Sequence, residues 1–373
     1  MSGGSVTLFL GGDVMPGRGV DQILRHPGDP TLWESSVRDA RRYVELAEAV
    51  NGPIPRPVDY VWPWGDALAV LDRFAPAVRL VNLETSVTRS ADVAAGKAVN
   101  YRMSPDNVPV LTAARLDACA LANNHVLDFG PAGLAETLDT LDSAGIAVTG
   151  AGRDATEAAR PAVLPIGRNG DGRVVVFSFG TPSSGVPPSW AATADGAGVA
   201  VLPDLSERTA AVIGDRVTRG RQPGDIVVVS LHWGPNWGYA VTPAEVRFAH
   251  RLVDAGVDLV HGHSSHHPRP VEVYRERLVL YGCGDLVDDY EGIAGYGRYR
   301  DDLRLLYLPR LEAGTGRLLD LRMVPMQAHR MRLRPAVPLD REWLHRTLYR
   351  VSRGYGTKIS LDPDGLLGLA VEA

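Results

Sequence analysis

The stretch VDLVHGHSSHHPRP (257–270) carries four of the ten histidines of this chain within seven residues. Its first half is a short apolar run typical of a buried strand, and its second half is polar. A buried imidazole needs a hydrogen-bond partner for each ring nitrogen, so a cluster kept for structure alone would be costly. Neutral imidazole is the commonest metal ligand in proteins. The pattern therefore predicts a strand that ends in a metal site, with an exposed, solvated turn as the alternative.

Four other apolar runs end in the same way. Segments 6–13, 77–85, 116–125 and 225–234 each predict a short strand that is followed by polar residues. In α/β folds, functional sites form where the carboxyl ends of strands meet loops. The recurrence predicts an α/β fold with one site assembled from several strand ends. The polar residues at these ends are Asp13, Asn82, Glu84, Asn123, Asn124, His125, His232 and His263.

Composition and charge exclude several classes of protein. The 373 residues are 45% hydrophobic and 22% charged, which is typical of a globular protein. The net charge of −5 argues against a nucleic-acid partner, which would require a basic face. Two cysteines in apolar runs, Cys119 and Cys283, predict buried thiols and no disulfide framework. Neither a secretion signal nor a membrane-spanning segment is predicted, so we expect a cytoplasmic protein without membrane contact.

The pattern along the chain predicts one catalytic domain over residues 1–328 and a C-terminal extension, 329–373, packed on it. Residues 25–63 are Pro-rich and charged, and they predict an insertion that carries a helix and either caps the site or is a surface elaboration. Leucines with helical spacing predict a helix over 131–144. A Thr-Pro pair, a favoured N-cap and N1 combination, opens a predicted helix over 242–255.

An ordered set of motifs resembles that of a known family. The sequence contains GGDVMPGR (11–18), NLE (82–84), ANNHVLDFG (122–130), HWG (232–234) and GHSSHHPRPVE (262–272), and YGCGDLVDD (281–289) resembles the closing segment. Over about residues 6–290 the chain resembles the CapA-like, or poly-γ-glutamate capsule-synthesis, family, which is similar to the calcineurin-like metallophosphoesterases. The resemblance implies an αββα sandwich of the metallo-dependent phosphatase type, with a helical insertion, and a two-metal centre.

The resemblance also implies a set of metal ligands. Oxygen ligands mixed with imidazoles suit Mn, Zn, Fe or Ca, and spacing does not choose among them. Met15 stands where the phosphoesterases have a histidine, and Ser264 and Ser265 replace the first two residues of a His-Pro-His. We therefore expect one or two divalent metal ions. The implied ligands are Asp13 and His266 for the first metal, Asn124, His232 and His263 for the second, and Glu84 in place of the bridging aspartate.

The implied acid or base is His125, which matches a non-ligand histidine beside the metals. Asp128 lies three residues later and can orient the His125 ring through a hydrogen bond. His267 is a candidate for proton transfer on the opposite face of a substrate. Arg18 can hold a carboxylate or phosphate near the metals, or it can form a salt bridge that supports its loop. The candidate substrate-binding residues are Asn82, Asn123, Trp233 and Trp237.

Three functions are compatible with this set. The first choice is metal-dependent Cα epimerisation, L to D, of a residue near the C-terminus of a ribosomal peptide precursor, because the motifs and the missing anchor resemble the lasso-peptide tryptophan epimerase. The second is a metal-dependent hydrolase or ligase that acts on a phosphoester or a poly-γ-glutamate amide. The third is a metal-dependent binding protein without chemistry. We expect a peptide substrate, with or without a leader peptide, whereas the sequence does not predict the oligomeric state.

Overall fold

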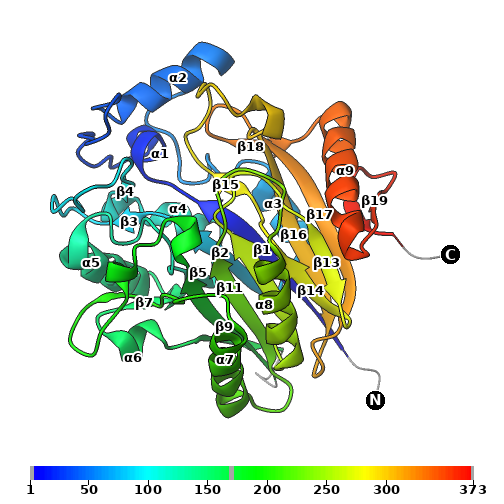
Figure 1. The fold of residues 1–373 in the computed structure, drawn as a ribbon. Helices are drawn as coiled ribbons and strands as arrows, with labels where there is room; N and C mark the ends of the chain where they lie inside the picture. The colour runs from blue at the N-terminus through cyan, green and yellow to red at the C-terminus, as the bar shows by residue number, and fades with distance from the viewer. Residues whose placement is uncertain (1–3, 168–171, 371–373) are drawn as a thin grey trace.

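Two β-sheets lie face to face, with helices on both outer sides (Figure 1). The structure is a computed structural model, and it describes residues 4–167 and 172–370. Its layers run helix, sheet, sheet, helix, so the predicted αββα sandwich is confirmed. The two termini lie on the same side of the molecule in this view (Figure 1).

The first sheet has strand order β19-β20-β17-β16-β1-β2-β5-β6, with β15 beside β1 and β18 beside β17. β1 runs parallel to β2 and to β15, and antiparallel to β16. The strands are β1 (Ser5–Val14), β2 (Val78–Leu83), β5 (Ala118–Ala120), β6 (Ala147–Thr149), β15 (Asp285–Val287), β16 (Leu303–Glu312), β17 (Leu318–Ala328), β18 (Leu333–Pro335), β19 (Ile359–Leu361) and β20 (Leu367–Leu369).

The second sheet has strand order β13-β14-β12-β11-β9-β8, and its centre is parallel. Two short pairs, β3 with β4 and β7 with β10, lie outside both sheets. The strands are β8 (Ala162–Ile166), β9 (Gly172–Gly180), β11 (Ile226–His232), β12 (Leu259–His263), β13 (Val271–Tyr274) and β14 (Arg277–Leu280), with β3 (Ser86–Val87), β4 (Arg102–Met103), β7 (Ala151–Gly152) and β10 (Gly198–Val199) in the short pairs.

Side chains of the central strands alternate between the two faces of each sheet, as the pleat requires. On β1, Leu8 and Leu10 point into the core between the sheets, whereas Phe9 points to the helices on the outer face. On β11, Val228 belongs to the same inner core and Val229 to the outer core beneath α7 and α8. Both faces are buried, which explains why these strands are continuous apolar runs.

The helices form the two outer layers. α1 (Arg18–Ile23), α2 (Arg41–Asn51), α3 (Ala67–Phe74), α4 (Pro109–Ala113) and α5 (Gly130–Ser143) pack on the first sheet, α7 (Glu207–Gly220) and α8 (Pro243–Asp254) pack on the second, and α6 (Ala155–Ala158) and α9 (Pro338–Ser352) lie at the edges. α8 begins with a complete capping box between Thr242 and Glu245, in agreement with the helix predicted there.

The structure shows which helices and strands the insertion and the C-terminal extension contain. The insertion over residues 25–63 contains α2, which packs on α1. Its Tyr43 belongs to a small apolar cluster with Leu32 and Ala40 of the same insertion. The extension over residues 329–373 contains β18, α9, β19 and β20, and these strands lengthen the first sheet beyond β17. Its weak periodicity reflects this mixture of short strands and one helix. The domain boundaries themselves stay a prediction.

Candidate metal centre

Strand register brings the predicted ligands together at the carboxyl ends of both sheets. In the first sheet, Asp13 of β1 pairs with Asn82 of β2 and with Asp285 of β15. In the second sheet, His232 of β11 pairs with His263 of β12. The sheets face one another, and Asp13 Oδ1 lies 3.9 Å from His263 Nδ1. All five side chains are buried.

Carboxylates of the first sheet form one side of the site. The amide of Asn82 donates to Asp13 Oδ1 at 2.7 Å and to Glu84 Oε2 at 3.1 Å, and the Ser264 N–H donates to Asp13 Oδ2 at 3.1 Å. Burial, together with the nearby Asp285, raises the pKa of Asp13 to about 7. Burial and the charge of Asp13 raise the pKa of Glu84 well above its ordinary value. Burial and mutual repulsion of the carboxylates thus outweigh the opposing charges of His266 near Asp13 and of Lys97 near Glu84.

Imidazoles of the second sheet form the other side. His232 Nδ1 lies 2.9 Å from His263 Nδ1, and His232 Nε2 lies 3.0 Å from Asn124 Oδ1 and 3.8 Å from Glu84 Oε1. His263 Nε2 lies 2.8 Å from the hydroxyl of Ser230. Burial lowers the pKa of both histidines well below the ordinary value. Both rings are thus neutral, the form in which imidazole binds metals.

A third part of the site pairs His266 with Asp285, a residue that the sequence analysis did not single out. His266 Nδ1 lies 2.9 Å from Asp285 Oδ1, and His266 Nε2 lies 2.9 Å from Asn236 Nδ2. Burial lowers the pKa of His266, but the Asp285 carboxylate outweighs it and the net shift is upward. Asp285 follows a glycine, as Asp13 does, and that shared pair was the available signal.

The donor set fits a divalent metal. Asp285 Oδ2 is buried and has no hydrogen-bond partner within residues 4–167 and 172–370, as expected of an oxygen reserved for a cation. Carboxylate oxygens and neutral imidazoles together suit first-row divalent metals. Two groups bring one ligand atom from each member within 4.8 Å of one another: Asp13, His232 and His263 form the first, and Asp13, His266 and Asp285 form the second.

His125 stands beside these ligands with its ring oriented by Asp128. His125 Nδ1 lies 2.6 Å from Asp128 Oδ2, which also accepts the Tyr101 N–H at 2.7 Å, and His125 Nε2 lies 3.8 Å from Glu84 Oε1. Burial lowers the pKa of His125 to about 4, against the opposing effect of Asp128. The ring is therefore neutral at pH 7, with Nδ1 bonded to the carboxylate and Nε2 directed to Glu84.

Lys97 completes this group, and no sequence pattern indicated it. Its ammonium donates to the Asn124 carbonyl and to Asp128 Oδ1, lies 3.2 Å from His125 Nδ1, and sits 5.1 Å from the centre of the Trp190 ring. It lies in the irregular segment between β3 and β4, where no periodicity marks a functional residue. Lys97 thus ties a candidate ligand's backbone to the carboxylate that orients His125.

Of the two roles predicted for Arg18, the contacts in the structure correspond to the salt bridge that supports its loop. Its Nε and Nη2 donate to Asp289 at 3.1 and 2.5 Å, and its Nη1 donates to Glu34 at 3.0 Å. The guanidinium also lies 3.8 Å from the Tyr43 ring centre and 4.4 Å from the Tyr101 ring centre. Two buried carboxylates already neutralise Arg18. These bonds correspond to the salt bridge that the sequence predicts, and binding of a substrate carboxylate or phosphate by Arg18 stays a prediction.

His267 is held by backbone groups rather than facing a substrate. Its Nδ1 lies 3.0 Å from the Pro268 carbonyl, and its Nε2 accepts the Gly238 N–H at 2.9 Å. The ring stacks on Tyr299 with centres 4.6 Å apart, and burial lowers the pKa of His267 to about 4. With both ring nitrogens bonded, His267 fixes its loop. These bonds support a structural role, and proton transfer by His267 on the opposite face of a substrate stays a prediction.

Two candidate substrate-binding residues, Trp233 and Asn123, are also buried and hydrogen-bonded to other residues of the protein. Trp233 is fully buried against Phe248 and Tyr281, and its indole N–H donates to the Tyr281 carbonyl. Asn123 is fully buried, donates to the Asn82 side chain, and accepts the N–H of His125. Strand alternation directs Trp233 away from its neighbour His232 and into the outer core. Asn82 itself holds Asp13 and Glu84, so both asparagines position other residues.

A cavity of about 240 Å³ opens beside His125 and His266. Trp237, the fourth predicted substrate-binding residue, lines it and stacks on Tyr296 with ring centres 4.0 Å apart. The insertion contributes Tyr43 to the same wall, in keeping with its expected place over the site. The remaining lining residues are Arg18, Val99, Tyr101, Asn236, Tyr290, Ile293 and Asp301.

Fold and site together define an αββα protein with a buried cluster of candidate ligands for a divalent metal. A family model described as "Bacterial capsule synthesis protein PGA_cap" matches residues 7–290. The chain belongs to this family. Every helix among the described residues is too short or too polar to cross a membrane.

Several relatives and solved structures are similar to this chain. A "probable polyglutamine synthesis accessory protein" of Mycobacterium tuberculosis is 55% identical over 363 residues, 97% of this chain and 95% of the relative. The "PGA biosynthesis protein CapA" of Bacillus subtilis is 27% identical over 85% of this chain and 70% of its own length. The 5'-nucleotidase precursor of Thermus thermophilus has a TM-score of 0.47 and 17% identity, and covers 87% of this chain and 54% of its own.

Proposed function

We propose that the protein is a metal-dependent enzyme that hydrolyses a peptide-type amide, with His125 as its proton-transfer group. The free ring nitrogen of His125 carries the proposal. Among the site's histidines, within the described part of the chain, His125 Nε2 is the one ring nitrogen without a hydrogen bond, and the ring lines the cavity. A general acid or base requires such a free nitrogen within reach of the reacting atoms.

Charge in the cavity favours an amide over a phosphoester. Arg18 is neutralised by Asp289 and Glu34, and Lys97 is bonded to Asp128. Apart from a bound metal, a phosphate would therefore meet no unpaired cationic side chain among the described lining residues, whereas a neutral amide needs none. Relatives named for polyglutamine synthesis and PGA biosynthesis support a glutamyl or glutaminyl polymer as the substrate.

Different residues of this chain have different roles in the proposed reaction. A divalent metal held by the candidate ligands would polarise the scissile carbonyl and lower the pKa of water. Asp128 accepts the hydrogen bond that the Nδ1–H of His125 donates, which leaves the lone pair of Nε2 free for the reaction. Because the ring is neutral at pH 7, Nε2 can take the proton of the attacking water and return it to the leaving nitrogen. Asp13, Glu84 and the imidazole ligands hold the metal, and Asn82 orients both carboxylates.

The test is hydrolysis in isotopically labelled water. Protein loaded with Mn²⁺ or Zn²⁺ is incubated with poly-γ-glutamate, α-linked polyglutamine and p-nitrophenyl phosphate in H₂¹⁸O. We expect ¹⁸O in the new carboxylate of a glutamyl polymer and about a 100- to 10,000-fold loss of turnover in His125→Gln. His26→Gln, which changes an exposed histidine, is the matched control. Turnover of the phosphoester alone, or of no substrate at all, would contradict the proposal.

Cα epimerisation is the second candidate, and two tyrosines favour it. Inversion needs a proton donor besides His125, and Tyr101 and Tyr290 line the same cavity with their hydroxyls 2.7 Å apart. Burial raises the pKa of both phenols well above the ordinary value, so both stay protonated and can donate. His267, the donor expected from the sequence, is bonded to backbone.

Deuterium distinguishes the two reactions. Epimerisation of a peptide in D₂O places one deuterium at Cα without cleavage, and Tyr290→Phe should abolish that label. Hydrolysis cleaves the chain and leaves Cα unlabelled. Inversion without solvent deuterium would exclude the epimerisation mechanism.

A further inference from the structure

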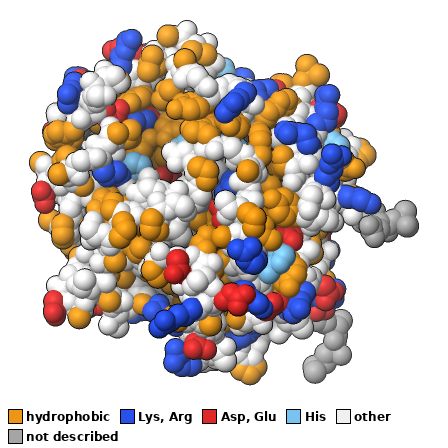
Figure 2. Space-filling model, in the orientation of Figure 1, with side chains coloured by type: hydrophobic (Ala, Val, Ile, Leu, Met, Phe, Trp, Pro, Cys, Tyr) orange, Lys and Arg blue, Asp and Glu red, His pale blue; other side chains and the backbone are white. Residues whose placement is uncertain are grey.

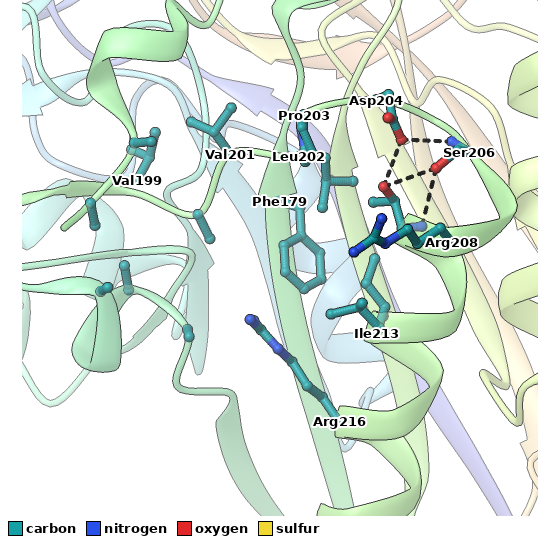
Figure 3. A pocket seen from close by; sticks show the side chains of 18 residues that line it. Phe179, Val199, Val201, Leu202, Pro203, Asp204, Ser206, Arg208, Ile213 and Arg216 are labelled. Atoms are coloured by element: carbon teal, nitrogen blue, oxygen red, sulfur yellow. Dashed lines mark hydrogen bonds between the residues drawn. The ribbon is translucent and has the colours of Figure 1, made fainter. Parts of the chain in front are cut away.

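A larger cavity, of about 530 Å³, is lined by α7, α6 and residues 191–206 (Figure 3). None of the candidate metal ligands, and none of the residues around His125, lines it. The larger part of its lining is apolar and includes several alanines together with Phe179, Leu202 and Ile213. A cavity of this size falls within the range that holds a drug-sized ligand, about 300–1,000 Å³.

One face of α7 gives this cavity a positive rim. Arg208, Val212 and Arg216 recur every fourth residue, so they share one face of the helix. Figure 3 shows both arginine side chains extending from α7 toward the cavity. The two Cα atoms are about 12 Å apart along the helix, because each residue adds about 1.5 Å. Lys and Arg side chains also gather at the lower edge of the molecule, over α7, in Figure 2.

Both guanidiniums lack a bonded partner in the described part of the protein. Neither Arg208 nor Arg216 makes an ion pair or a hydrogen bond there, and the charge of Arg208 makes only a minor contribution to the lowered pKa of Asp204. Arg221, just beyond the helix, binds Asp258. Asp204 is the one acidic lining residue, and it already accepts hydrogen bonds from the Ser206 N–H at 2.9 Å and from the Thr209 hydroxyl at 2.6 Å. The lining therefore contains two arginines without a hydrogen-bonded partner and one carboxylate, Asp204, that already accepts two hydrogen bonds.

We propose that this cavity is a binding site for an elongated apolar small molecule that ends in a carboxylate or phosphate. The apolar part of the lining would bury the chain, and each CH₂ removed from water strengthens binding. A guanidinium binds carboxylate and phosphate through paired N–H donors, and here two guanidiniums stand at the rim with no acid bonded to either. Val212, 48% exposed between them, covers the chain where it enters the cavity.

The test measures binding of dodecanoate and dodecyl phosphate to the full chain by isothermal titration calorimetry, below the concentrations at which either probe aggregates. We expect saturable binding of one molecule per chain, and the tighter probe identifies the headgroup. The variant with both Arg208→Gln and Arg216→Gln should bind at least about tenfold more weakly, because charge-assisted hydrogen bonds are lost. Arg219→Gln, on the same helix but outside the lining, should bind as the wild type does.

A second variant tests the cavity rather than the charge. Val212→Trp adds bulk at an exposed position, so the protein should fold, and the larger side chain should block binding of both probes. Equal affinity for dodecyltrimethylammonium, unchanged affinity in the double arginine variant, unchanged affinity in Val212→Trp, or no saturable binding of either anionic probe would each overturn the proposal. Far-UV circular dichroism of each variant confirms that the fold is intact.

Discussion

Replacing Asp285 with Asn should weaken metal binding without destabilising the metal-free protein. Asp285 Oδ1 lies 2.9 Å from His266 Nδ1, whereas the buried Oδ2 has no hydrogen-bond partner within the described residues. An unpaired buried polar group costs about 1–3 kcal/mol, and a charged one costs more. Asn removes that charge. We therefore expect the metal-free variant to match the wild-type free energy of unfolding or exceed it, by up to about 3 kcal/mol.

The metal-bound protein should respond in the opposite direction. Loss of a residue that merely supports a ligand costs about 10- to 100-fold in metal affinity, and Asp285 is itself a candidate ligand. At a metal concentration 100 times the wild-type Kd, binding stabilises the fold by about 2.7 kcal/mol. A site that binds 100-fold more weakly gains only about 0.4 kcal/mol at the same concentration. The metal-dependent rise in stability should therefore nearly disappear.

Urea unfolding with and without Mn²⁺ or Zn²⁺ measures both effects, and calorimetry gives the Kd directly. Asp142→Asn, an exposed carboxylate on α5, is the matched control and should change neither quantity. An unchanged Kd in Asp285→Asn would refute the assignment of Asp285 to the metal centre. A metal-free variant that is less stable than the wild type by more than about 1 kcal/mol would refute the inference that Oδ2 is unpaired.

Three further substitutions separate catalysis, metal binding and structure. Lys97→Met should lower turnover about tenfold or more with metal content unchanged, because Asp128 loses the ammonium that helps to fix it; unaltered turnover would count against this role. His267→Gln should cost about 1–3 kcal/mol in urea unfolding and leave metal content intact, whereas loss of metal would restore His267 to the site. Arg18→Met should cost about 3–5 kcal/mol, since it leaves Asp289 buried without its cation; an unchanged unfolding midpoint would contradict the structural role.

The apolar runs that end in polar residues allowed much of the architecture and three residues of the candidate metal site to be predicted from the sequence. Asp13, His232 and His263 were predictable because parallel strands end at one edge and polar residues follow apolar runs there. Asp285 is the first residue of β15 and ends no strand, so only the Gly-Asp pair that it shares with Asp13 could have indicated it. Trp233 was also open to a better prediction, because alternation along β11 directs it away from the side that His232 faces.

Other roles depend on contacts that no local pattern encodes. Arg18 finds Asp289 across 271 positions of sequence, so its neutralisation becomes visible only when the chain is folded. Lys97 lies in an irregular segment, and its partners come from the loop after β5. His267 has the residue type of a ligand but bonds to backbone, and residue type alone does not distinguish these fates.

Division of the ligands between the sheets links the metal to the fold itself. The carboxylates of Asp13 and Asp285 come from strands of the first sheet, whereas His232 and His263 come from strands of the second. A cation held by both sets joins the two sheets at the edge where the core between them ends. Without it, acidic groups of one sheet face neutral imidazoles of the other, and neither set neutralises the other. The metal should therefore stabilise the sandwich as a whole, and its loss should loosen first the edge at which His125 meets the cavity.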